Sequence, residues 1–109
     1  MATLNKVPGV TYAGTPAFSR YNDAIVLGTA AAVSWTAPDQ CSWVIIEPTD
    51  AVWGNLLGTA VVPVANVTDG SASQRMSTPY QIRIAAGEVL SLIRAGSSSV
   101  TVSIAVYSD

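Results

Sequence analysis

The C-terminal end of the chain carries the clearest alternation of apolar and polar positions. Val100, Val102, Ile104 and Val106 are separated by single residues that are mostly small and polar. A period of two places successive side chains on opposite faces of a β-strand. The pattern therefore predicts a strand over 99–107 with one apolar face and one small, mostly polar face.

Short apolar stretches bounded by turn-forming residues occur throughout the chain before this strand. Because such stretches are typical of strands, they predict strands at 24–27, 31–35, 42–47, 58–64, 80–84 and 88–94, with a further candidate at 52–57. Residues 66–78, rich in Ser, Thr, Asp and Gly, predict a loop. The short turn at 95–98 predicts that the last two strands pair as a C-terminal hairpin. No stretch has the apolar spacing of an amphipathic helix, so we expect almost no helix.

Short strands at this spacing indicate the fold class. Seven or eight of them, separated by turn signals roughly every 8–12 residues, are typical of an all-β sandwich. We predict a compact antiparallel β-sandwich or jelly roll over residues 24–109. Residues 1–23 contain prolines, glycines and aromatic residues without hydrophobic periodicity, and they predict an extended N-terminal arm. Such an arm lies either across its own domain or across a neighbouring subunit.

Charged residues are scarce, and this scarcity bears on partners. Only 11% of the residues are charged, against about 25% in an average soluble domain, while 50% are hydrophobic. A monomer with so few charges has a poorly solvated surface, so we expect much of this surface to contact other protein. The net charge of −2 and the scattered basic residues give no attraction toward nucleic acid. No apolar run is long enough to cross a membrane, and no signal peptide is evident, which favours synthesis in a cytosol.

The residue types needed for common catalytic and metal sites are largely missing. The chain contains no histidine and one cysteine, so the usual Ser or Cys catalytic triads and zinc clusters cannot be assembled. Glu47 and Asp50 are close in sequence, but they flank a proline turn where acidic residues are common. We therefore expect no enzyme activity, no catalytic residue, no cofactor and no metal site. Cys41 is expected to be a structural, partly buried thiol.

The three tryptophans are the best candidates for ligand binding. Trp35 and Trp43 fall in predicted strands, where a large aromatic side chain usually fills a core or a subunit contact. Trp53 lies beside Gly54 and Asn55 in a predicted turn, which makes it the most exposed of the three. An exposed indole can stack on a sugar ring, so Trp53 is the candidate for a glycan contact.

The C-terminal half of the chain follows a recognisable pattern of strands and turns. The pattern is an apolar strand ending in Val-Pro, a Gly/Ser-rich loop, a strand, an Ala-Gly turn and a final pair of apolar strands. The segments that carry it are 61–63, 68–72, 79–82, 86–93 and 102–107. Over residues 24–107 this cadence resembles small structural proteins encoded among the head genes of tailed bacteriophages. These are β-sandwich or jelly-roll modules, commonly dimers or trimers, that decorate or cement capsids or form the bases of head fibres.

The resemblance implies a function as a bacteriophage virion structural protein. A decoration or cement protein of this kind would bind the major capsid protein as a homo-oligomer, a trimer or a dimer, and stabilise the head shell. Such a protein would be made in the cytoplasm of the host bacterium and would lie on the capsid surface. The alternatives are a tail or fibre component, a carbohydrate-binding β module, and a small jelly-roll coat protein.

The resemblance consists of turns and core positions, so it assigns no functional residue. Candidate contact residues come instead from the expected surface of the chain. The aromatic residues of the arm and the small polar face of the last strand are the candidates for contact with the capsid or a sister subunit: Tyr12, Phe18, Tyr21, Ser99, Thr101 and Ser103.

Overall fold

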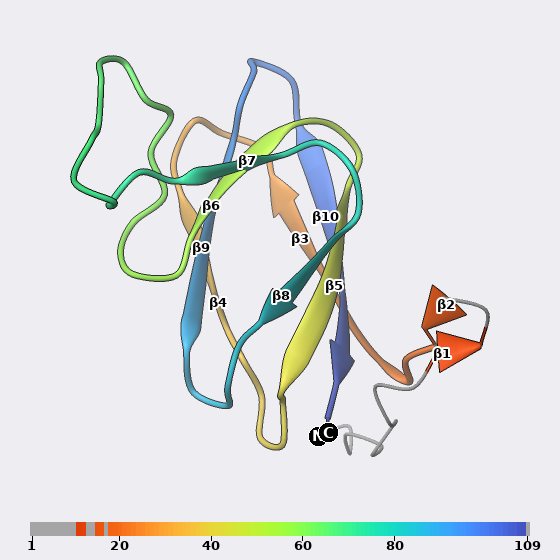
Figure 1. Ribbon diagram of the computed structural model, residues 1–109. Coiled ribbons are helices and arrows are strands. Elements are labelled where there is room, and N and C mark those ends of the chain that lie inside the picture. Colours follow the sequence, from red (N-terminus) through yellow and green to blue (C-terminus); the bar gives the residue numbers. More distant parts are fainter. Residues whose placement is uncertain (1–10, 13–14, 17, 109) are drawn as a thin grey trace.

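The computed structural model describes residues 11–12, 15–16 and 18–108 (Figure 1). These residues form ten β-strands and no helix, and none of them belongs to a helix that could span a membrane. Two very short strands, β1 (Thr11–Tyr12) and β2 (Thr15–Pro16), pair with each other near the N-terminus. The other residues of the predicted arm before Phe18, namely 1–10, 13–14 and 17, lie outside the described residues.

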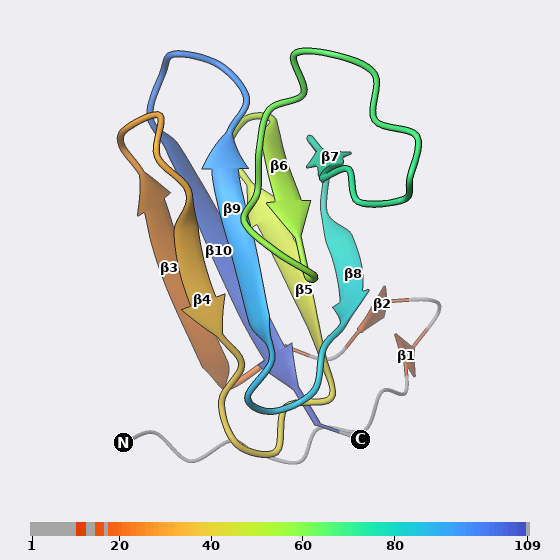
Figure 2. The ribbon, with the colours of Figure 1, turned by 90° about the vertical axis from the view of Figure 1, so that its left-hand side faces the viewer.

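The other eight strands form two four-stranded antiparallel sheets, which lie side by side in Figure 1 and one in front of the other in Figure 2. Their bounds are β3 (Tyr21–Leu27), β4 (Val33–Thr36), β5 (Trp43–Pro48), β6 (Val52–Asn55), β7 (Gln74–Met76), β8 (Tyr80–Arg83), β9 (Val89–Arg94) and β10 (Val100–Tyr107). Sheet I has the order β3–β10–β5–β8, and sheet II has the order β4–β9–β6–β7. The prediction of an all-β antiparallel sandwich of seven or eight strands is confirmed.

The strand pairs are nested along the chain. β3 pairs with β10, β4 with β9, β5 with β8, and β6 with β7, so the first strand of the sandwich meets the last and the middle two meet each other. This is one long hairpin folded over on itself, the topology of a jelly roll. Among these eight strands, β6 and β7 are the only consecutive pair that share a sheet.

The core lies between the two sheets and is built from alternate residues of the strands. Val100, Val102, Ile104 and Val106 of β10 all point inward and are at most 2% exposed, as their alternation predicts. They pack with buried side chains of the other strands and connections: Leu27, Trp35, Ala37, Cys41, Val44, Ile46, Val52, Met76, Ile84, Leu90 and Leu92. Burial of this apolar surface is the main stabilising contribution to the fold.

The predicted C-terminal hairpin is wrong. β9 pairs with β4 and β6 in sheet II, whereas β10 pairs with β3 and β5 in sheet I. The connection over 95–99 therefore crosses from one sheet to the other. Both strands have one apolar face, and placing them in opposite sheets lets those faces meet across the core.

Two local predictions in the middle of the chain are also wrong. Residues 58–64 form no strand, and a short strand, β7, lies inside the predicted loop 66–78. Side chains of other segments satisfy the backbone of the first stretch: Ala60 N–H donates to Ser91 Oγ at 2.8 Å, and Val61 N–H donates to Ser73 Oγ at 3.0 Å. Pro63 has no N–H to offer a sheet.

Sheet I begins earlier in the chain than the predicted domain boundary at residue 24. β3 starts at Tyr21, whose half-buried ring packs against the core cluster. Ser19 is buried, and its hydroxyl donates to the carbonyl oxygen of Val106 at 2.5 Å. The last residues of the predicted arm are therefore attached to β10.

Candidate functional site

The described residues offer little that could carry out acid–base or metal chemistry. No group of three or more His, Cys, Asp or Glu residues among them could hold a metal ion. Cys41 is buried, and its thiol lies 3.4 Å from the carbonyl oxygen of Ile84. Burial raises the pKa of Cys41 to about 11, so the thiol stays protonated at neutral pH and is a poor nucleophile.

The outer face of sheet I presents a group of short, uncharged side chains. We call this surface the β3–β10 face, and define it by Asn22, Ala24, Val26, Thr101 and Ser103, all of which are exposed. The strand register places Ser103 opposite Ala24 and Thr101 opposite Val26. Val26 is 62% exposed, although it is aliphatic. On the other side of β10, Ser103 is paired with Glu47 of β5, so a single carboxylate borders the face.

An aromatic pair lies at one end of the same sheet. The rings of Trp43 and Tyr107 stack with centroids 4.1 Å apart and an interplanar angle of 7°. Both residues are 3% exposed, although the register pairs them directly after the inward pair Val44 and Val106 and so places them on the outward side of the sheet. Burial raises the pKa of the Tyr107 phenol above its ordinary value. Trp43 thus makes a packing contact, as predicted for a tryptophan in a strand.

The predicted contact residues are separated by the fold. Thr101 and Ser103 lie together on the β3–β10 face, while Ser99 is exposed in the connection before β10. Phe18 is 96% exposed, three residues before β3 begins, whereas Tyr21 packs against the core. Tyr12 belongs to β1, and its side chain lies outside the described residues. The alternation of apolar and polar residues predicted that Thr101 and Ser103 share a face of β10. It did not indicate that Ala24 and Val26 lie beside them.

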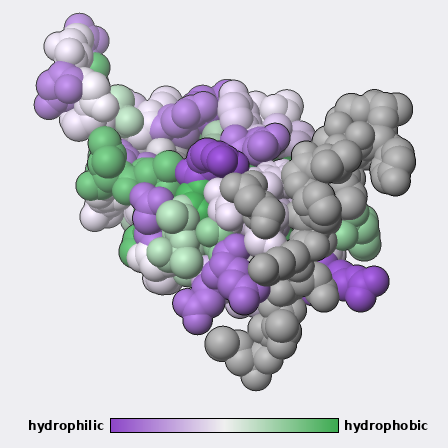
Figure 3. Space-filling model, turned by 60° about the horizontal axis from the view of Figure 1, so that its bottom comes forward, coloured by the Kyte–Doolittle hydropathy of each residue, from purple (hydrophilic) through white to green (hydrophobic). Residues whose placement is uncertain are grey.

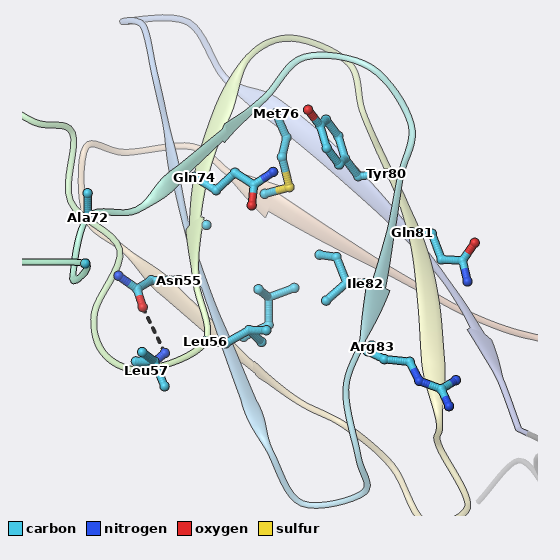
Figure 4. A pocket seen from close by; sticks show the side chains of 13 residues that line it. Asn55, Leu56, Leu57, Ala72, Gln74, Met76, Tyr80, Gln81, Ile82 and Arg83 are labelled. Carbon is cyan, nitrogen blue, oxygen red and sulfur yellow. Dashed lines mark hydrogen bonds between the residues drawn. The ribbon is translucent and has the colours of Figure 1, made fainter.

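A pocket opens where the edge strands β7 and β8 of the two sheets meet. Its volume is about 520 Å³, and we call it the open-edge pocket. Met76 and Ile82 point into it, and Leu90 also lines it (Figure 4). Gln81 and Arg83 extend away from it along the rim. The pocket is thus a mostly apolar depression with polar groups at its edge, and no pattern in the sequence indicated it.

The β6–β7 loop, residues 56–73, borders this pocket and projects from the sandwich (Figures 1 and 2). Five aliphatic residues of the loop are exposed by 40% or more: Leu56, Leu57, Val61, Val64 and Val67. Figure 3 shows hydrophobic side chains gathered at the foot of the protruding segment. Such a concentration of exposed aliphatic side chains in one loop is typical of a protein-binding surface.

Hydrogen bonds fix the two ends of this loop. Asn55 Oδ1 accepts from Leu57 N–H at 2.8 Å, and Ser91 Oγ on sheet II accepts from Ala60 N–H. At the other end, the hydroxyl and the amide N–H of Ser71 donate to the carboxylate of Asp69, which lowers the pKa of Asp69. The exposed aliphatic residues are therefore presented by a loop with its own internal support.

Trp53 lies in a strand and not in the predicted turn. It belongs to β6, and the register places it between Ile93 of β9 and Arg75 of β7. Its side chain is half-buried on the outer side of sheet II. Trp35 is 6% exposed and belongs to the core cluster, as predicted.

Comparison with known proteins identifies no relative of this chain. No protein-family model matches the chain, and searches of curated proteins and of solved structures give no match either.

Proposed function

We propose that this chain is a bacteriophage virion structural protein that decorates or cements the head. In this proposal the protein is not an enzyme. It acts as a homo-oligomer on the capsid surface, where it binds the major capsid protein and stabilises the shell. The observation that carries the proposal is the β3–β10 face, an exposed sheet surface of short uncharged side chains. The phage assignment itself comes from the sequence resemblance over residues 24–107.

The chemistry of the β3–β10 face suits close contact with another protein. Ala24, Ser103 and Thr101 have short side chains, so little conformational entropy is lost when they are covered. The face carries no charge of its own, so no ion must be desolvated at its centre. Val26 and the exposed ring of Phe18 add apolar surface that gains free energy on burial.

A subunit that binds only the assembled shell stabilises that shell by mass action. The contact needs no reaction step and no cofactor. Its strength depends on how many copies bind and on how much surface each copy buries. This mechanism is consistent with a chain whose charged residues make up 11% of the total.

The test is binding to head shells that lack this protein, measured by co-sedimentation. Ser103→Arg and Ala24→Arg place a long charged side chain in the face, and we expect each to weaken binding at least tenfold. Thr36→Arg is the matched control, because Thr36 is exposed on β4 of the opposite sheet. Phe18→Ala reports separately on the aromatic residue before β3. Wild-type affinity in both arginine variants of the face would overturn the proposal.

A carbohydrate-binding module, in a tail or fibre or on its own, is the second candidate function. The partial exposure of Trp53 between Arg75 and Ile93 favours it, because an aromatic face beside a polar donor can hold a sugar ring. Trp53→Ala, compared with wild type on a glycan array, tests this candidate. Loss of glycan binding in the variant would favour it over shell decoration, and the absence of any glycan binding by the wild type would remove it.

A further inference from the structure

We infer that the β6–β7 loop and the open-edge pocket together form a twofold interface between two copies of this chain. The inference rests on the proposed function, because it names the self-association surface of the proposed oligomer. It places that surface on the side of sheet II and strand β8, away from the outer face of β3 and β10 that is proposed to contact the shell.

The loop supplies the projecting half of this interface. Val64 is 97% exposed and Leu57 is 90% exposed, so neither side chain has appreciable contact within its own subunit. Exposed aliphatic side chains are ordinary when scattered singly, but five within one loop are not. Covering them removes apolar surface from water, which is the main favourable contribution in most protein associations.

The pocket supplies the receiving half. Its walls come from β6, β7, β8 and β9, and Met76, Ile82 and Leu90 give it an apolar lining. A volume of about 520 Å³ is enough to receive several aliphatic side chains from outside. The loop and the pocket adjoin, because Leu56, Leu57, Gly70 and Ala72 of the loop also line the pocket rim.

The charges near this surface favour contact between identical copies. Residues 56–73 contain one charged residue, Asp69. Among the residues that line the pocket, Arg83 alone is charged, and its side chain extends away from the opening (Figure 4). A contact of loop to pocket therefore sets no like charges of the two copies against each other.

The adjacency of the loop and the pocket specifies the symmetry. In a ring of three subunits, projecting and receiving surfaces lie on different sides of each subunit. Here they share one side, so a twofold axis can seat each loop over the pocket of the other copy in a single contact. The loop and β8 together provide about 20 residues, near the roughly 20–30 residues that each partner contributes to a stable interface.

Sedimentation equilibrium of the full chain tests the inference. We expect twice the 11.3 kDa chain mass at micromolar concentration. Leu57→Asp combined with Val64→Asp should raise the dissociation constant at least tenfold, because two exposed aliphatic contacts are replaced by charges. Ala30→Asp combined with Ala31→Asp is the matched control, since it places two charges on exposed residues between β3 and β4, outside both proposed surfaces, and should leave the dimer intact.

Circular dichroism of each variant establishes that it is folded. A second substitution, Ala72→Trp, tests the same interface by blocking the rim of the pocket without introducing a charge in the loop. A monomeric or trimeric wild type would overturn the inference, as would a loop variant with unchanged mass. Binding to head shells distinguishes the two proposals. A dimer that dissociates in the loop variants but binds no heads overturns the proposed function alone, whereas a trimer that binds heads overturns the twofold interface alone.

Discussion

Trp35 of β4 donates its indole N–H to the carboxylate of Asp23 in β3 at 2.8 Å, and this hydrogen bond joins the edge strands of the two sheets. It closes one side of the sandwich with a polar contact that faces inward. An inward carboxylate also protects an edge strand against unwanted pairing with other chains. The opposite side, between β7 and β8, has the open-edge pocket instead.

Removal of this contact should destabilise the fold. Asp23→Ala leaves the indole N–H of the buried Trp35 without its acceptor, at an expected cost of about 1–3 kcal/mol in the free energy of unfolding. Asp23→Asn keeps an oxygen acceptor and should cost less. Urea denaturation followed by tryptophan fluorescence measures both variants. Equal stability of Asp23→Ala and wild type would show that the hydrogen bond contributes nothing.

Alkaline pH should lower the free energy of unfolding, because the Cys41 thiol then loses its proton. Burial raises the pKa of this thiol from 9.0 to about 11, so the folded state holds the proton more tightly than the unfolded state. The resulting stabilisation is fully present below pH 9 and is lost as the pH rises from 9 toward 11. Burial also raises the pKa of Tyr107 above 10.0, which adds to the loss at the upper end of this range.

Urea denaturation at several pH values between 8 and 11 measures this effect. Cys41→Ala should show a shallower loss of stability than wild type over the same range, because the contribution of the thiol is then absent. In the native protein at pH 8, alkylation of the thiol by iodoacetamide should be slow and should accelerate on unfolding. Rapid alkylation of the folded protein would contradict the burial of Cys41.

An added methyl group at the floor of the open-edge pocket should lower the stability of the fold slightly. A Cβ on Gly54 would lie 2.5 Å from Met76 Cε and 3.3 Å from Leu92 Cδ2, so the end of the Met76 side chain must shift. Because that end is flexible and Met76 borders the pocket, we expect Gly54→Ala to cost about 1 kcal/mol, at the low end of the cost of overpacking. Gly58→Ala is the control, because a Cβ there meets nothing within 4 Å, and it should not lower the stability.

Thermal unfolding of the two glycine variants, followed by circular dichroism, makes this comparison. If both lower the melting temperature equally, the close packing of Met76 over Gly54 does not matter to stability.

Ser91 should control the mobility of the β6–β7 loop. This serine is buried on sheet II, and its hydroxyl accepts from the buried Ala60 N–H. Ser91→Ala leaves that N–H without its acceptor, which should cost about 1–3 kcal/mol and release the first part of the loop. Faster hydrogen exchange at Ala60 and faster proteolysis within 56–73 are the expected results. Ser34→Ala, opposite Ser91 in the register and exposed, should change neither rate.

Alternation in the sequence identified the faces of the strands but not their partners. The pattern over 99–107 predicted β10 and its inward residues correctly, because period two depends only on local geometry. The pairing of β10 with β3 and β5 depends on segments more than 50 residues away, and no local signal records it. The predicted hairpin was therefore wrong, although both of its strands exist.

The residues of the candidate surfaces could also be predicted only where they belong to one strand with clear alternation. Thr101 and Ser103 could be predicted, because their small polar side chains alternate with valine and isoleucine. Ala24 and Val26 could not, because β3 has apolar residues on both of its faces. Val61 and Val62 resemble strand residues in composition. Only the folded chain brings Ser91 and Ser73 close enough to accept hydrogen bonds from this stretch instead.

The nested strand order also bears on the order in which the sandwich can form during synthesis. β10 follows the other strands of the sandwich in the sequence, yet it lies inside sheet I, between β3 and β5. Until β10 has been made, β3 has no partner in its sheet and the β3–β10 face is incomplete. A chain cut before β10 would therefore lack half of the surface that is proposed to contact the shell.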